Sequence, residues 1–184
     1  MSYRILLSLL ASLLLVGCTG LPEQVQPIQN FELSPYLGRW YEIARLDHSF
    51  ERGLSRVSAE YSLRDDGGVM VLNRGYSADE GEWKEATGKA YLVGAANVGH
   101  LKVSFFGPFY SSYVIFDRDG DDLAYVSGYS KDYLWLLSRS PQITPAQKQR
   151  FIDKARALGF EVEALIWVTQ GEEEQASQLP GADK

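Results

Sequence analysis

Cysteine is almost absent from this chain: of its 184 residues only Cys18 carries a thiol, so no disulfide can form within the chain. Its fold must therefore be stabilised by a packed core rather than by cross-links. Histidine is also scarce, since His48 and His100 are the only two and lie far apart in the sequence. No metal-ligand spacing or Gly-x-Ser-x-Gly turn occurs, and Asp47-His48-Ser49 are adjacent residues whose side chains cannot easily converge as a triad. The sequence predicts a protein that is not an enzyme and needs no metal or cofactor.

An excess of positive charge is lacking as well. The chain has 18 Lys and Arg against 24 Asp and Glu, a net charge of −6 at neutral pH. Nucleic acids are bound by basic surfaces, so we expect no nucleic-acid partner. No polybasic segment is present to attract anionic lipid headgroups. Apolar residues make up 45% of the chain and aromatic residues 12%, which is enough for the core of a single domain.

No apolar run is long enough for a membrane-spanning helix, and the longest lies at the N-terminus. Arg4 precedes residues 5–16, which are nearly all apolar. This stretch is shorter than the roughly 20 residues that cross a bilayer and is typical of a secretory signal. It ends in Leu15-Val16-Gly17-Cys18, which resembles the lipobox of bacterial lipoproteins, where the cysteine thiol receives a diacylglycerol and cleavage follows the glycine. We predict a lipoprotein signal peptide over residues 1–17 and lipidation at Cys18; an ordinary signal with a chance cysteine is the alternative.

The residue after the cysteine bears on the cellular location of the protein. It is Thr19, whereas many enteric bacteria use an aspartate there to retain lipoproteins at the inner membrane. The lipobox resemblance therefore implies the outer membrane of a Gram-negative bacterium, with the protein lipid-anchored on the periplasmic face. Several acyl chains make a stable anchor, whereas one chain holds only marginally. The membrane is thus a predicted partner through the N-terminal lipid anchor.

Composition divides the rest of the chain into three parts. Residues 18–34 are polar and contain two prolines, so we predict a tether between the lipid and the domain. Residues 169–184 are acidic and nearly free of large apolar residues, which predicts a disordered tail. The folded domain is expected over residues 35–168.

Short runs of alternating polarity, separated by turn signals, fill most of this domain. Asp65-Asp66-Gly67-Gly68 is a strong hairpin signal between two of them. We predict eight strands with no helix between them, over residues 40–46, 58–63, 69–76, 84–93, 100–106, 110–116, 123–129 and 133–138.

A helix is expected only after the eighth strand. Thr144 is a candidate N-cap with Pro145 at the first helical position, and an apolar stripe that includes Phe151 and Ala155 runs to Gly159. Residues 160–168 are predicted as a short ninth strand. The expected fold is all-β: an eight-stranded antiparallel up-and-down β-barrel with one C-terminal α-helix and a ninth short strand, because closure removes exposed strand edges. An immunoglobulin-like sandwich is the weaker rival, since its Cys–Trp–Cys spacing is absent.

Three motifs in this order resemble those of the lipocalin family, in particular its bacterial outer-membrane lipoproteins. Gly38-Arg39-Trp40 is similar to the Gly-x-Trp that opens the first strand. Asp132-Tyr133 is similar to the second motif, although Lys131 stands where a threonine is usual. Arg139 matches the arginine that caps the closed end of the barrel against the tryptophan. We interpret Gly38, Trp40, Asp132, Tyr133 and Arg139 as structural, since a guanidinium stacked on an indole stabilises the closed end by cation–π attraction.

Alternate residues of a barrel strand face its interior, where one small ligand can be held. Motif alignment predicts small inward residues (Ala86 and Gly88 among them) beside aromatic ones, which together imply a void; a filled interior is the alternative. The parity of strands six and seven stays open, including Tyr113, Tyr125 and Val126. The predicted interior, ligand-binding set is Glu42, Ala59, Tyr61, Val71, Asn73, Ala90, Val103, Phe105, Trp135 and Leu137.

The resemblance and the apolar interior together predict the ligand class. They imply a carrier or store of fatty acids or lysophospholipids that serves envelope maintenance under stress. The alternative is a structural or interaction protein of the envelope with a filled barrel. Phe106, Phe109 and Tyr110 form an apolar hairpin tip for which three interpretations stay open: contact with a lipid surface, a homodimer contact, or a plain turn.

Overall fold

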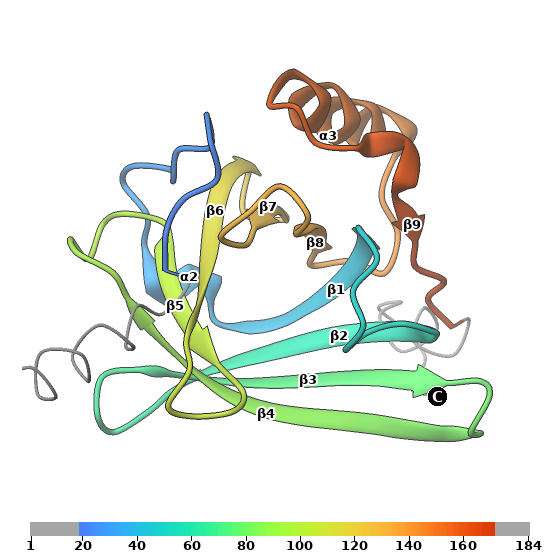
Figure 1. The fold of residues 1–184 in the computed structure, drawn as a ribbon, viewed down its shortest axis with the longest axis horizontal. Helices are drawn as coiled ribbons and strands as arrows, with labels where there is room; N and C mark the ends of the chain where they lie inside the picture. The colour runs from blue at the N-terminus through green and yellow to red at the C-terminus, as the bar shows by residue number, and fades with distance from the viewer. Residues whose placement is uncertain (1–18, 172–184) are drawn as a thin grey trace, which may run out of the picture.

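A computed structural model describes residues 19–171, and the statements below concern these residues. The predicted signal peptide, Cys18 and the predicted tail from residue 172 onward lie outside them. Figure 1 shows a barrel of antiparallel strands with one long helix, α3, beside it. Within residues 19–171 no helix is long and apolar enough to span a bilayer.

The eight-stranded barrel is closed, as predicted. From β2 to β8 each strand pairs with the next along the chain, and β1 pairs with both β8 and β2. The β2–β3 hairpin forms at the predicted turn, where Asp66 Oδ1 accepts a hydrogen bond from the Gly68 amide at 3.0 Å. The strands are β1 (Gly38–Arg45), β2 (Leu54–Leu63), β3 (Val69–Ser77), β4 (Glu82–Leu92), β5 (His100–Ser104), β6 (Ser111–Asp119), β7 (Leu123–Ser127) and β8 (Leu134–Ser138).

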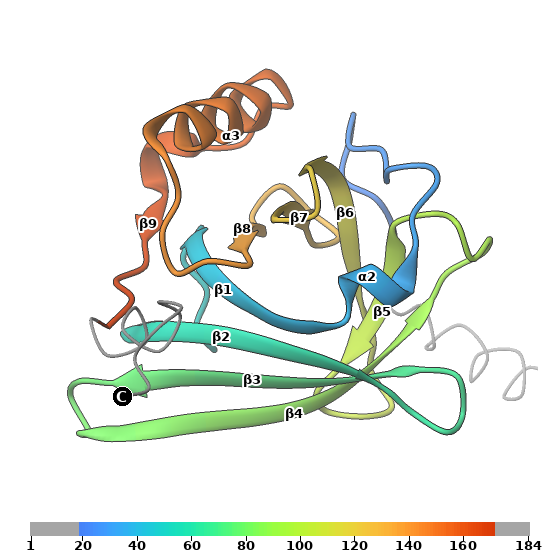
Figure 2. The same cartoon turned by 180° about the vertical axis from the view of Figure 1, so that it is seen from behind.

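The strands differ in length, so among the described residues a stretch of strand edge at one end of the closed barrel has no partner strand. β5 pairs with β4 only through Lys89–Leu92, so within the described sheet the stretch of β4 from 82 to 88 is hydrogen-bonded on the β3 side alone. Figures 1 and 2 show β2, β3 and β4 as a long ribbon that reaches well beyond the short β5. The end of the barrel reached by this ribbon is therefore more open than the end near the short helix α2 (Leu33–Tyr36).

Two apolar clusters lie on opposite sides of the barrel wall. One is outside and joins the wall to α3 (Pro145–Ala157), where Phe151 and Ala155 are fully buried among outward side chains of β6 to β8. The other fills the interior and includes Trp40, Tyr61 and Val71. The helix begins as predicted: Gln147 N donates to Thr144 Oγ1 at 3.2 Å and Thr144 N donates to Gln147 Oε1 at 2.8 Å, a capping box.

The predicted ninth strand over residues 160–168 is wrong in extent. Phe160 and Val162 pack against the outside of the barrel, and a 3₁₀ helix, η2 (Val162–Ala164), follows, so only β9 (Ile166–Trp167) is extended and paired. β9 pairs with the end of β1, beyond the point where β2 has left it. The following residues fill this seam: Arg56 N donates to Thr169 O at 2.8 Å, and Gln170 Nε2 donates to Glu42 O at 2.8 Å and Val57 O at 3.1 Å. The packed domain thus continues through Gln170, past the predicted boundary at 168.

The segment predicted as a tether also packs on the barrel. Val25 is fully buried beside Val114 and Phe116, and Phe31 is buried in the interior cluster. Ile28 exchanges backbone hydrogen bonds of 2.9 Å with the chain of β6 and with Gly99. The described chain is therefore ordered against the wall well before residue 35, because apolar side chains of this stretch find partners there.

Candidate functional site

The narrow end of the barrel is plugged by the predicted pair. The Arg139 guanidinium lies 3.8 Å from the centre of the Trp40 ring. Its Nη1 donates to Arg39 O at 2.6 Å, and its Nη2 donates to the carbonyls of Pro35 (2.6 Å) and Leu37 (2.8 Å). Gly38 has φ +88°, a conformation that L side chains rarely adopt. These contacts plug this end of the barrel with protein groups.

The second motif lies at the opposite end. Asp132 is exposed in the β7–β8 connection, where its carboxylate accepts a 2.9 Å hydrogen bond from Ser130 Oγ. Tyr133 packs over Gly128, where a Cβ would lie 2.8 Å from the tyrosine Cβ, and stacks near Trp135 with ring centres 6.1 Å apart. Both residues shape the turn into β8, consistent with a structural interpretation.

The strand register places the predicted interior residues on the inner face of the wall. Ala59 lies between Trp40 and Asn73, and Asn73 is paired in turn with Ala86. Similar rows across the sheet bring together most of the remaining members, which are Tyr61 with Val71, Ala90 with Val103, Glu42 with Leu137, and Trp135 beside Val126. Phe105 lies beyond the end of β5 and packs against the same interior cluster.

The register also settles the two strands whose parity the sequence left open. On β6, Tyr113 and Ile115 face inward; on β7, Ala124 and Val126 do so, whereas Tyr125 faces the helix.

The interior has a packed zone and an accessible zone. Near the closed end, Tyr36 and Tyr61 are each hydrogen-bonded to the Tyr113 hydroxyl, at 2.5 and 3.0 Å, and fill the lumen. Burial raises the pKa of all three phenols, so they remain neutral. Ala90 is 3% exposed in this zone.

Towards the open end the inward row of Ala59, Asn73 and Ala86 is different. Ala86 is exposed although it faces inward, and its two neighbours in the row are half-buried. Trp135, Val103 and Phe105 are also half-buried. Exposure on an inward face means that this part of the lumen is reached by solvent. No hydrogen bond within the described chain engages the Asn73 amide, so it offers a free polar group in an otherwise apolar space.

One expectation about small inward residues needs correction. Gly88 does not open a void, because a Cβ built on it would lie 2.8 Å from the Phe105 ring. The aromatic side chain lies directly over the glycine and occupies that space. The accessible lumen therefore lies nearer to Ala86 than to Gly88.

A polar cluster that the sequence did not reveal is buried beside this lumen. A register shift between Glu42 and Ala44 turns Arg45 inward, where its Nη1 donates to Glu42 Oε1 at 2.6 Å and its Nη2 to Glu51 O at 2.7 Å. Trp135 Nε1 donates to Glu51 Oε2 at 3.1 Å. Glu42, Arg45 and Glu51 are each less than 10% exposed.

The charges in this cluster compensate one another. Burial raises the pKa of Glu42 well above its usual value, and the neighbouring Glu51 carboxylate adds to the effect. Burial also raises the pKa of Glu51. Arg45 opposes both shifts by supplying the nearest positive charge. The Glu42 carboxyl is thus engaged by protein groups, so Asn73 is the better placed of the two polar candidates to meet a ligand.

His48 lies at the edge of the same cluster. Its ring packs against Phe50, Tyr133 and Trp135, with ring centres 4.7 to 5.3 Å away. Its Nε2 is 3.5 Å from Glu51 Oε2, and neither ring nitrogen has a hydrogen-bond partner within the described residues. Burial lowers the pKa of His48 to about 4, with Arg45 adding to the effect, so the ring is neutral at physiological pH and makes no ion pair.

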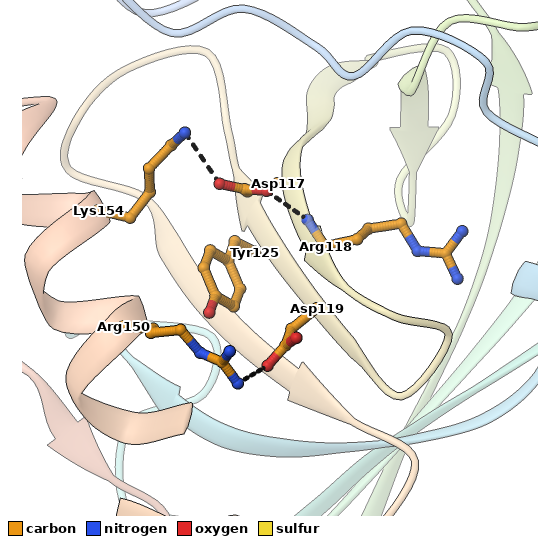
Figure 3. A pocket seen from close by; sticks show the side chains of 6 residues that line it. All are labelled: Asp117, Arg118, Asp119, Tyr125, Arg150 and Lys154. Atoms are coloured by element: carbon orange, nitrogen blue, oxygen red, sulfur yellow. Dashed lines mark hydrogen bonds and ion pairs between the residues drawn. The ribbon is translucent and has the colours of Figure 1, made fainter. Parts of the chain in front are cut away.

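A surface pocket of about 340 Å³ lies outside the barrel, between α3 and the β6–β7 hairpin (Figure 3). Two ion pairs lie within it: Lys154 Nζ is 2.9 Å from Asp117 Oδ2, and Arg150 pairs with Asp119. Tyr125 forms its floor, and burial raises the pKa of this phenol to about 12. We interpret the ion pairs in this pocket as contacts that hold α3 against the barrel wall. The described part of the chain holds no group of three or more His, Cys, Asp or Glu side chains placed to bind a metal.

Comparison with known proteins agrees with this geometry. Residues 31–170 match the family model described as a lipocalin-like domain. The chain is 57% identical over 169 residues to the outer membrane lipoprotein Blc of Vibrio cholerae, covering 91% of this chain and 99% of that protein. It is 50% identical over 163 residues to the protein of the same name from Escherichia coli K12, covering 87% and 92%. Among solved structures, the cockroach allergen Per a 4 superposes with a TM-score of 0.67 at 18% identity, covering 84% of this chain and 98% of that one, a likeness of fold alone.

Proposed function

This chain belongs to the lipocalin-like family, and on that premise we propose that it is a lipid-anchored binding protein of the outer membrane that carries or stores fatty acids or lysophospholipids. Relatives at 50% and 57% identity, each covering most of the chain, are outer membrane lipoproteins of Gram-negative bacteria. The protein accordingly acts as a binding protein and resides at the outer membrane, attached through a lipid on Cys18 on the periplasmic face. Envelope maintenance under stress is the role that such a carrier would serve.

The observation that carries this proposal is the accessible inward row of Ala59, Asn73 and Ala86. Two of these side chains are small, and the half-buried Trp135 and Phe105 belong to the same interior cluster as Ala59. An acyl chain is flexible and apolar and gains free energy for each methylene it removes from water, about 0.8 kcal/mol. The Asn73 amide is placed to hydrogen-bond a carboxyl or ester group, which a hydrocarbon alone would not use.

Single substitutions can separate a lumen ligand from other bound lipid. Ala86→Trp places an indole in the accessible lumen, whereas Thr87→Trp places the same residue next along β4, where the register points it outward and it is exposed. Ala90 is less suitable for such a change, because it is packed in the closed half and an added indole would overfill the core.

The test is native mass spectrometry with lipid extraction on the chain from residue 18 carrying Cys18→Ser, purified from bacteria. We expect a bound fatty acid or lysophospholipid that Thr87→Trp retains and Ala86→Trp loses, with both variants folded by circular dichroism. A protein that arrives empty and takes up no added fluorescent fatty acid would instead favour a filled barrel whose surface binds an envelope partner. Intact mass of the membrane-extracted native protein tests the anchor separately, through the mass of acylated Cys18.

A further inference from the structure

The connection between β5 and β6 exposes the largest apolar side chains of the described surface. Phe106 is 81% exposed and Phe109 is 74% exposed, the two highest values among large apolar residues of this part of the chain. The tip, residues 105–110, reads Phe-Phe-Gly-Pro-Phe-Tyr and contains no charge. Single exposed apolar residues are common on soluble proteins, but two neighbouring phenylalanines at a protruding tip indicate a surface with an apolar partner.

The path of the N-terminal segment bears on whether the membrane that holds the proposed anchor lies near this tip. Ile28 is hydrogen-bonded to Ile115 in the middle of β6, and Val25 belongs to the same buried cluster as Val114. Further upstream, Ser112 Oγ donates to Gly20 O at 2.6 Å, at the beginning of β6. Traced back towards the N-terminus, the segment thus follows β6 towards the open end and the 105–110 tip.

Chain geometry then bounds the position of the proposed anchor. Consecutive Cα atoms are about 3.8 Å apart, so Cys18 lies within roughly 8 Å of Gly20, and Phe109 lies within roughly 11 Å of Ser112. An acyl group on Cys18 would therefore enter the membrane on the side of the barrel that carries Phe106 and Phe109.

The base of the tip has the features of a lipid interface. Tyr110 lies beside Lys89 and Lys102, whose ammonium groups are 6.0 and 5.1 Å from its ring centre. A tyrosine flanked by lysines suits the headgroup layer, where the aromatic ring is partly buried and the ammonium groups meet phosphate. These two cations stand at the tip although the chain as a whole carries a net charge of −6.

The tip also borders the opening of the lumen. Phe105, its first residue, packs over Gly88, the last residue of the β4 stretch that lacks a partner strand on this side in the described sheet. Ala86, exposed on the inner face, lies two residues further along β4. A membrane in contact with the tip would therefore lie next to the accessible lumen.

We propose that the 105–110 tip docks into the bilayer that holds the lipid anchor, with Phe106 and Phe109 inserted among the acyl chains, so that the open side of the lumen faces the lipid surface. This rests on the proposed anchoring at Cys18. Ligand then passes between bilayer and lumen without crossing bulk water, which makes the tip a determinant of transfer rate rather than of ligand affinity.

The test compares the double variant Phe106→Ser/Phe109→Ser with a matched control, Leu63→Ser/Met70→Ser, which removes two exposed apolar side chains (61% and 40% exposed) from elsewhere on the surface. Vesicles of phosphatidylethanolamine and phosphatidylglycerol with brominated acyl chains report insertion: Phe106→Trp, placed in the Cys18→Ser chain, should be quenched by them. Sedimentation with the same vesicles should fall about tenfold or more for the tip variant and stay unchanged for the control. With the acylated full chain, transfer of a fluorescent lysophospholipid from vesicle to barrel should slow about tenfold, while its equilibrium affinity stays the same.

Other outcomes overturn the proposal. A shift from dimer to monomer in the tip variant, with vesicle binding unchanged, would assign the tip to a second copy of the chain. No change in any assay would make it a plain turn. Failure of the proposed function can be distinguished from failure of this proposal. A protein that binds no lipid in the lumen still shows insertion of the tip by quenching. A protein whose Cys18 carries no acyl group is identified by its intact mass before vesicles are used.

Discussion

His48 should make the stability of this protein depend on pH between 4 and 6.5. The folded protein holds its pKa at about 4, whereas an exposed histidine titrates near 6.5. Because the folded-state pKa is lowered, the unfolded chain binds a proton more readily as the pH falls. The contribution of His48 to stability is complete above pH 6.5 and is lost progressively as the pH falls towards 4.

The size of the effect follows from the displacement of the pKa. One pKa unit corresponds to about 1.4 kcal/mol, so linkage predicts a loss of about 2 kcal/mol at pH 5 and about 3 kcal/mol at pH 4, relative to neutral pH. These are upper values, because local relaxation that admits water to the ring would reduce them. Even half of this loss exceeds the error of a denaturation experiment.

His48→Phe is the substitution that isolates the effect. Phenylalanine keeps the stacking with Phe50, Tyr133 and Trp135, and it replaces ring nitrogens that have no hydrogen-bond partner in the described structure. We expect the variant to be at least as stable as the wild type at pH 7.5 and more stable by about 2 kcal/mol at pH 5. His100→Gln is the control, since it removes the other histidine and leaves the environment of His48 intact.

Urea denaturation followed by tryptophan fluorescence between pH 5 and 8 provides the measurement. The raised pKa values of Glu42 and Glu51 make stability fall as the pH rises, which is opposite to the effect of His48. Both residues are present in wild type and variant, so their contributions largely cancel when the two free energies of unfolding are subtracted. A difference between wild type and His48→Phe that stays constant across this range would refute the reasoning, because it would mean that the buried ring titrates normally.

Four further substitutions test the other packed groups. Arg45→Met should cost about 3–5 kcal/mol in urea unfolding because it leaves the buried carboxyl groups of Glu42 and Glu51 without their cation. Glu42→Gln should cost under about 1 kcal/mol and flatten the loss of stability that the raised pKa of Glu42 causes as the pH rises above 4.5. A larger cost for the glutamine variant would contradict the raised pKa of Glu42. Arg139→Lys should lower stability by about 2–3 kcal/mol, since one ammonium cannot replace three carbonyl hydrogen bonds and the stacking on Trp40; equal thermal unfolding of the two proteins would show that the plug is not stabilising. Thr144→Ala removes the capping hydrogen bond of α3 and should cost about 1 kcal/mol, measured by circular dichroism during denaturation.

Barrel and helix were predictable from the sequence because each depends on local signals, whereas the closed end was predicted from the resemblance of Gly38, Trp40 and Arg139 to lipocalin motifs. Alternating polarity and the Asp-Gly-Gly turn mark the strands, and Thr144 with Pro145 marks the start of the helix. Strand parity was predictable where strands run without interruption. The parity of β6 could not be predicted, because its register with β7 shifts between Ile115 and Asp117. Such a shift exchanges the inner and outer faces along one strand. A bulge of this kind adds one residue to a strand and has no fixed sequence signal.

The candidate site shows the same division. The apolar interior residues followed from alternation, whereas the buried Arg45 did not, because the shift after Glu42 turns a residue inward that regular alternation would place outside. Gly88 was misread for a different reason. A small residue predicts a void only if no neighbour fills it, and Phe105 comes from beyond the end of β5, where regular pairing has ceased.

The N-terminal segment is the part where composition misled most, and its packing matters for function. Residues 19–31 are mostly polar and contain two prolines, yet Val25 and Phe31 are each at most 2% exposed. These two side chains cover apolar surface on the wall, and backbone hydrogen bonds of Ile28 and Phe31 add to the hold on the segment. A freely jointed linker would let the barrel turn in any direction relative to the membrane. A segment fixed as far as Gly20 leaves only Thr19 between it and Cys18, the proposed site of acylation, so under that proposal folding sets the orientation of the lumen. Val25→Ser should therefore reduce lipid transfer from vesicle to barrel in the anchored protein while sparing lipid affinity in solution, and equal transfer rates would show that the fixed segment does not orient the barrel.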